Sequence, residues 1–164
     1  PYVKESVTVS LREEVETLRQ IPLFAKVDPS KIKLLAFTSE RVVFQPGDFV
    51  CQQGEMGDAA YVIMNGQADV MVNTPSGPIT VATMKKNDVV GEIAILINIP
   101  RTATIKAASE LTTLRITKDQ FFRMTGEFPE MAVEMMRVLA ERLVRTTEEL
   151  QKAKESLQKE DDGT

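Results

Sequence analysis

Two pairs of residues, the second of which begins nine positions after the first ends, carry groups suited to binding a phosphorylated sugar. Gly91 and Glu92 follow a β-like run, and Arg101 and Thr102 follow Pro100. A helical turn that begins after Gly91 would expose unpaired backbone N–H groups, which attract anions. Arg101 can bind a phosphate through its planar guanidinium, and Thr102 adds a hydroxyl. A carboxylate beside an anion needs another partner, and a ribose hydroxyl suits Glu92.

The composition excludes several classes of function. The chain has 164 residues, a net charge of -4, no His and one Cys. A metal oxygenase on a β-roll would need clustered His ligands, and His is also the commonest general base. Because the chain has no His, we expect no enzyme, no metal and no cofactor. The single Cys51 excludes an internal disulfide. The negative charge predicts no direct contact with nucleic acid or membrane, and the lack of a leader or apolar span predicts a cytoplasmic protein.

The residues that must position this site lie in a β-rich middle segment. From Glu40 to Thr117, short β-prone runs alternate with Gly- and Pro-rich turns. Seven or eight such strands predict an α+β protein built on an antiparallel, jelly-roll-like β-roll. Asn65-Gly66 is a strong hairpin signal, so we expect Ala60–Met64 to pair with Gln67–Val72.

Helices are predicted before this segment. Ser10 and Glu13 form a capping box that predicts the start of a first helix, which ends at Ile21-Pro22. Asp28-Pro29 predicts the start of a second helix. Its buried side would consist of Ile32, Leu35 and Ala36.

A long helix is predicted after the β-rich segment. Thr117 and Gln120 form a capping box, and Phe128-Pro129 opens a stretch without Gly or Pro. A heptad seam runs along it, made by Met136, Leu143, Leu150 and Leu157 with Ala132, Leu139, Thr146 and Ala153. The helix either forms a parallel dimeric coiled coil, or docks its first half on the roll and leaves the rest solvated. We favour a homodimer, because a lone helix would expose the distal leucines.

The stretch from Gly91 to Leu96, continued by Pro100-Arg101-Thr102-Ala103-Thr104, resembles the phosphate-binding cassette of the cyclic nucleotide-binding domain family. This family includes the catabolite activator protein, cyclic-nucleotide-dependent kinase regulatory domains and cyclic-nucleotide-gated channels. The resemblance covers about Leu18 to Leu143. Glycines 47, 54 and 66 stand where the family places turns of its roll.

The resemblance implies specific roles for the cassette residues. Arg101 would bind the cyclic phosphate, and Glu92 would accept a hydrogen bond from the ribose 2′-OH. Backbone N–H groups of Ile93, Ala94 and Thr102 would complete the phosphate site, with Gly91 allowing close approach.

The resemblance also implies how the base is bound. A hydroxyl at Thr102 is compatible with cyclic GMP as the ligand, although cyclic AMP is favoured. A residue of the long helix would cap the base, and the sequence does not choose among Leu139, Arg142 and Leu143.

These features predict a cyclic nucleotide sensor in four parts: helical residues 1–37, the roll 38–117 with its cassette 89–104, helices over 118–160, and a disordered tail 161–164. Ligand binding would reposition the long helix and act on an effector outside this chain. The alternative is a regulatory fragment of a transcription factor, channel or kinase whose output domain is absent, which would agree with a chain that starts at Pro1. A ligand-free module is disfavoured because Glu92 and Arg101 are both present.

Overall fold

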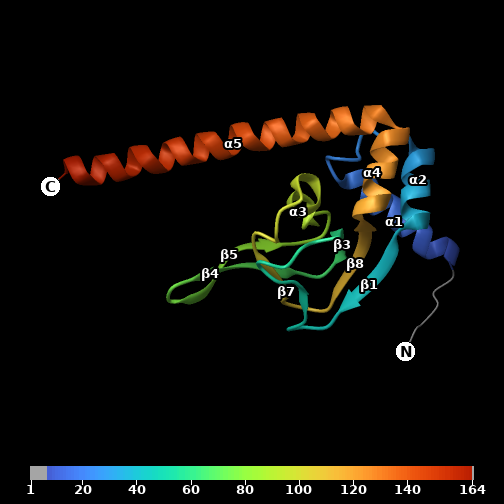
Figure 1. Ribbon diagram of the computed structural model, residues 1–164, viewed down its shortest axis with the longest axis horizontal. Helices are drawn as coiled ribbons and strands as arrows, with labels where there is room; N and C mark the ends of the chain where they lie inside the picture. Colours follow the sequence, from blue (N-terminus) through green and yellow to red (C-terminus); the bar gives the residue numbers. More distant parts are fainter. Residues whose placement is uncertain (1–6, 164) are drawn as a thin grey trace.

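The computed structural model describes residues 7–163, with side chains from residue 11 onward. It contains helices at both ends and a compact group of strands between them (Figure 1). The helices are α1 (Val7–Gln20), α2 (Pro29–Thr38), α3 (Glu92–Ile97), α4 (Lys118–Glu127) and α5 (Pro129–Asp162). The strands are β1 (Glu40–Phe44), β2 (Phe49–Cys51), β3 (Ala59–Asn65), β4 (Ala68–Thr74), β5 (Gly77–Met84), β6 (Val89–Val90), β7 (Thr104–Ala107) and β8 (Leu111–Thr117).

The strands form two antiparallel four-stranded sheets, in the orders β1-β8-β3-β6 and β2-β7-β4-β5. The predicted α+β roll of about eight strands is therefore confirmed. A tight turn joins β4 to β5, because these strands pair from Thr74 opposite Gly77. The strands together with α3 span residues 40–117, inside the segment 38–117 that the sequence assigns to the roll.

The hairpin predicted at Asn65-Gly66 is wrong. β3 pairs with β6 and β8, whereas β4 pairs with β5 and β7, so the chain crosses between sheets at this point. Gly66 has a φ of 90°, and a Cβ there would lie 2.1 Å from the Glu110 carbonyl oxygen. The positive φ and the packing against the turn between β7 and β8, rather than a hairpin between β3 and β4, explain this glycine.

The predicted start is wrong for the first N-terminal helix and right for the second. The capping box at Ser10 does not start α1, because the helix already includes Val7 and Ser10 lies inside it. Val7 stands four residues before Leu11 and extends the apolar helical spacing. For α2 the prediction is confirmed, since Asp28 accepts a hydrogen bond from the Ser30 N–H and Pro29 is the first helical residue.

Two apolar clusters hold the elements together. The larger one joins the helices to one sheet and includes the predicted Ile32, Leu35 and Ala36 of α2. It also buries Met131 and Met135, which attach the first turns of α5 to the rest of the molecule. The smaller cluster lies within the roll and includes Val90 of the cassette and Ile105, which follows it directly. The cassette is thus packed between a helical layer and a sheet core.

The C-terminal helices begin as the sequence predicts. Thr117 and Gln120 form a reciprocal capping box at α4, and Pro129 opens the 34-residue α5. The prediction of a disordered tail over residues 161–164 is wrong for residues 161 and 162. The helix continues through Asp162, and the Gly163 N–H donates to the Lys159 carbonyl. Lys159 in the last turn offsets the unfavourable effect of the terminal acids on the helix dipole.

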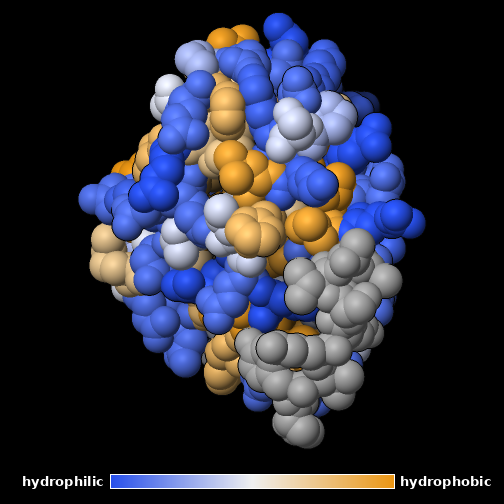
Figure 2. Space-filling model, turned by 90° about the vertical axis from the view of Figure 1, so that its right-hand side faces the viewer, coloured by the Kyte–Doolittle hydropathy of each residue, from blue (hydrophilic) through white to orange (hydrophobic). Residues whose placement is uncertain are grey.

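Most of α5 extends away from the roll (Figure 1). Every described side chain from Leu143 onward is exposed. The seam residues Met136, Leu143, Leu150 and Leu157 are between 56% and 68% exposed. Apolar side chains also collect on the opposite, helical end of the molecule (Figure 2), where Leu34 and Phe37 of α2 are exposed.

Candidate functional site

The cassette begins where β6 ends. Val90 pairs with Tyr61 of β3, and Gly91 then adopts a left-handed conformation with a φ of 83°. This turn directs the chain into α3, a six-residue helix whose N-terminus has no side-chain cap. Its first backbone N–H groups therefore have no partner from a capping side chain. The helix ends at Asn98, whose side chain accepts a hydrogen bond from Lys118 Nζ at 2.9 Å.

Arg101 is buried, and its guanidinium makes no ion pair with the part of the chain that the structure describes. Its side chain donates from Nη1 to the Gly91 carbonyl at 2.8 Å and from Nη2 to the Ala59 carbonyl at 2.6 Å. The residue is only 6% exposed, and no acid within residues 7–163 forms a salt bridge with it. A buried cation whose charge is unmatched favours an anion nearby. A guanidinium also has more donors than these two bonds use.

Glu92 is also buried, at 7% exposure, and its partner comes from the long helix. Arg142 of α5 donates from Nη1 to Glu92 Oε1 at 2.7 Å. The second carboxylate oxygen, Oε2, accepts no hydrogen bond from the described residues, so it remains open to a hydroxyl donor. The ion pair joins α5 to the first residue of α3.

A pocket of about 150 Å³ brings together six of the nine predicted residues. These are Gly91, Glu92, Ile93, Ala94, Arg101 and Thr102. Further lining comes from residues that the sequence did not single out for the site, including Cys51, Val70 and Met84. Burial raises the pKa of the Cys51 thiol, and the positive charge of Arg101 opposes that rise. The pocket therefore combines a buried cation, a buried acid and apolar walls.

The three candidates from the long helix do not line this pocket. Arg142 reaches it only through Glu92, Leu139 is half-buried, and Leu143 is 68% exposed. The sequence also missed two groups beside the Arg101 guanidinium, namely the Ala59 carbonyl, which accepts from it, and Gly57. Both lie more than 40 residues before Arg101, and no local pattern links them to it.

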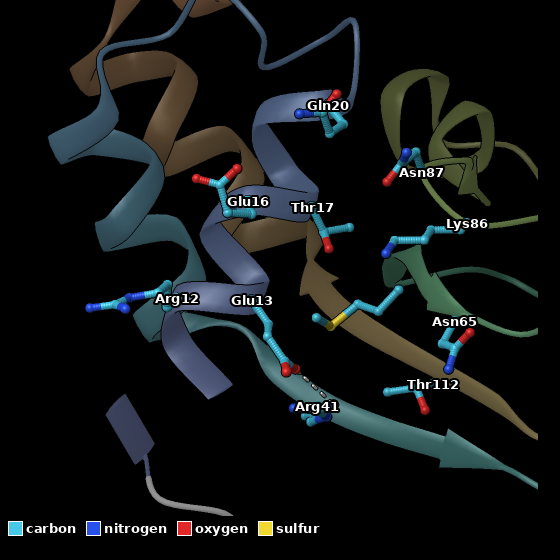
Figure 3. A pocket seen from close by; sticks show the side chains of 11 residues that line it. Arg12, Glu13, Glu16, Thr17, Gln20, Arg41, Asn65, Lys86, Asn87 and Thr112 are labelled. Atoms are coloured by element: carbon cyan, nitrogen blue, oxygen red, sulfur yellow. Dashed lines mark ion pairs between the residues drawn. The ribbon is translucent and has the colours of Figure 1, made fainter. Parts of the chain in front are cut away.

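A larger pocket of about 540 Å³ lies between α1 and the roll, away from the cassette (Figure 3). Lys86 and Asn87, from the turn before β6, face Thr17 of α1 across it. Glu13 and Arg41 form an ion pair of 3.9 Å at its edge. No residue of the cassette 89–104 contributes to it, so its size does not make it the candidate site.

Residues 7–163 lack two other kinds of site. No group of three or more Cys, Asp or Glu side chains is arranged to hold a metal ion there. None of the helices in that range is both long and apolar enough to cross a membrane.

A double-sheet roll with a short helix, a buried Arg and a buried Glu around one pocket defines a class of ligand-binding regulatory domain. A family model, the cyclic nucleotide-binding domain, matches residues 41–127, which include every strand except the first residue of β1. The chain belongs to the cyclic nucleotide-binding domain family, and its place there is that of a sensor and regulatory module.

Relatives of two kinds are similar to the chain. It is 36% identical over 109 residues to a cAMP-dependent protein kinase regulatory subunit of Yarrowia lipolytica, covering 66% of this chain and 28% of the relative. It is 32% identical over 136 residues to a CRP-like cAMP-activated global transcriptional regulator of Mycobacterium tuberculosis, covering 82% and 61%. The chain thus spans less than two thirds of either relative.

A solved structure agrees with these matches. The N-terminal domain of a transcriptional regulator from Streptomyces coelicolor A3(2) superposes with a TM-score of 0.71 at 28% identity. The match covers 80% of this chain and 92% of that domain. Kinase-type and transcription-type relatives match the same domain, so the comparisons favour the sensor module over any one type of output.

Proposed function

We propose that the chain binds a cyclic nucleoside monophosphate in the 150 Å³ pocket and transmits binding through α5. The observation that carries this proposal is Arg101, a buried guanidinium bonded only to carbonyl groups among the described residues. A cyclic phosphate would supply the missing negative charge and use the remaining donors. Backbone N–H groups of Ile93, Ala94 and Thr102 would share the phosphate oxygens.

Glu92 binds the ribose in this proposal. Its Oε2 would accept from the 2′-OH while Arg142 keeps Oε1. Arg142 then has a second effect, because it neutralises a carboxylate that would otherwise repel the phosphate beside it. Among the three candidates of the long helix, we therefore assign Arg142 to the site.

The volume of the pocket indicates how the ligand is oriented. Pockets for small molecules usually enclose about 300 Å³ or more. A pocket of 150 Å³ is smaller than this, so we propose that it holds the sugar and the phosphate and that the base lies outside it. The Thr102 side chain is exposed at this edge, where its hydroxyl could contact a purine. We propose cyclic AMP as the favoured ligand, since one relative is a subunit of a cAMP-dependent kinase and the other is a cAMP-activated regulator.

Calorimetric titration with cyclic AMP and cyclic GMP tests this function. Arg101→Ala is expected to weaken binding by about 2–5 kcal/mol, as when one half of a buried charge pair is removed. Arg123→Ala is the matched control, because Arg123 is exposed on α4. Wild-type protein that binds neither nucleotide, or an Arg101→Ala variant with unchanged affinity, would refute the proposal.

We also propose that α5 pairs with α5 of a second copy of the chain. The support is the row of exposed seam residues on a helix whose distal part makes no packing contact in the described structure. Sedimentation of the full chain should then give twice its mass of 18.3 kDa. Leu150→Gln combined with Leu157→Gln should reduce the mass to one copy, and Glu149→Gln should not. A wild-type monomer would exclude this dimer.

The module has no catalytic step in this proposal, and its output passes to an effector protein or domain. We expect it to act in the cytoplasm.

A further inference from the structure

The guanidinium of Arg101 lies in a slot between two glycines. A Cβ built on Gly91 would lie 2.2 Å from Arg101 Nη1. A Cβ built on Gly57 would lie 2.4 Å from both Cζ and Nε. Carbon atoms in contact are normally about 3.5–4.0 Å apart, so neither position tolerates a side chain while Arg101 stays in place.

The two glycines differ in why they lack a side chain. Gly91 has a left-handed φ of 83°, which favours glycine whatever lies beside it. Gly57 is not among the residues with positive φ. Its backbone would accept an L-residue, so the steric reason for glycine at position 57 is the guanidinium itself.

The loop that carries Gly57 also fixes Arg101 at its backbone. The Arg101 N–H donates to the Glu55 carbonyl at 2.7 Å, and the Arg101 carbonyl accepts from the Gly54 N–H at 2.9 Å. Ala59, at the end of the same loop, accepts from Nη2 at 2.6 Å. Arg101 is therefore held on its main chain, at the tip of its side chain and against one face of its guanidinium by residues 54–59.

We propose that Gly57 is a positioning residue that sets where the Arg101 guanidinium meets the ligand phosphate. This inference rests on the proposed function, because Gly57 acts on the ligand only through Arg101. A methyl group at position 57 forces the guanidinium to move by about 1 Å to reach normal contact distance. A displacement of this size can cost about 100-fold where geometry matters. We expect Gly57→Ala to weaken cyclic nucleotide binding by roughly 10- to 100-fold.

A double-mutant cycle tests whether the effect passes through Arg101. Titrations would compare wild type, Gly57→Ala, Arg101→Ala and the double variant, using cyclic AMP or cyclic GMP, whichever binds wild type more tightly. Gly57→Ala should cause no further loss once Arg101 is removed. Gly126→Ala is the control, because Gly126 lies in α4 with no positive φ and nothing within 4 Å of its added Cβ. An equal loss in both backgrounds would overturn the proposal, as would wild-type affinity in Gly57→Ala.

A second measurement needs no ligand. The ¹⁵N resonance of the Arg101 Nε–H group, assigned by its loss in Arg101→Ala, should shift in Gly57→Ala and stay in place in Gly126→Ala. An unchanged resonance in Gly57→Ala would overturn the positioning role. If the wild type binds neither nucleotide while this resonance shifts, the proposed function fails and the contact between Gly57 and Arg101 stands.

Discussion

Removing Arg142 is a direct test of how the long helix takes part in binding. The Arg142→Ala variant loses the ion pair to Glu92, whose side chain is 10% exposed, whereas the Arg142 side chain is 42% exposed. Exposed pairs contribute about 0.2–1 kcal/mol, and breaking a fully buried pair costs about 3–5 kcal/mol. Because Arg142 is partly solvated, the lower range applies, and we take about 1 kcal/mol as the contribution of the Glu92–Arg142 pair. Binding of the cyclic nucleotide should therefore weaken about five-fold.

The assay is calorimetric titration of full-length variants at low and at high salt. Arg145→Ala is the control, because Arg145 is an exposed residue of the same helix and forms no ion pair among the described residues. Salt should reduce the difference between wild type and Arg142→Ala, since the pair is partly screened. Tighter binding in Arg142→Ala would refute the reasoning, because the ion pair would then compete with the ligand for Glu92. Equal binding would remove Arg142 from the site.

Two further predictions concern the walls of the pocket. Thr102→Ala should weaken cyclic GMP binding more than cyclic AMP binding, because only guanine carries an amino group at C2 that could contact the hydroxyl. Equal losses in titration would exclude a base contact. Burial raises the pKa of the Cys51 thiol, so its thiolate fraction at neutral pH is below that of an unperturbed cysteine. Alkylation of Cys51, monitored by mass spectrometry, should be slow and should become faster as the pH rises. Bound nucleotide should slow it further. Equal rates with and without nucleotide would place the ligand elsewhere.

Local sequence signals predicted most of the elements, but not which strands pair. Asp28-Pro29 and the Thr117 capping box are satisfied within three residues, so the sequence is sufficient for them. Asn65-Gly66 has the residues of a hairpin turn, yet Gly66 is set by the distant Glu110 carbonyl. A turn motif specifies backbone angles, whereas strand partners depend on contacts far apart in sequence. The crossing between the two sheets could not be derived from the motif.

The same distinction explains the candidate site. Six predicted residues lie between positions 91 and 102, and local backbone geometry brings them to one pocket. The choice among Leu139, Arg142 and Leu143 depends on the rotation of α5, which is set by burial of Met131 and Met135. The sequence did not indicate a role for Gly57 at the site, because a glycine in a loop is usually explained by a turn. Only the position of the Arg101 guanidinium reveals its second use.

The connections of α5 determine how a bound nucleotide can act. Its first turns are fixed in the core by Met131 and Met135, and Arg142 ties it to α3. A ligand that binds one arrangement of the helix about 100-fold more tightly than another shifts the equilibrium by about 2.7 kcal/mol. That exceeds the roughly 1 kcal/mol of the Glu92–Arg142 pair. The assumed shift is therefore larger than the contribution of the pair, so we expect the nucleotide, more than the salt bridge alone, to determine where the distal helix and its exposed seam are presented.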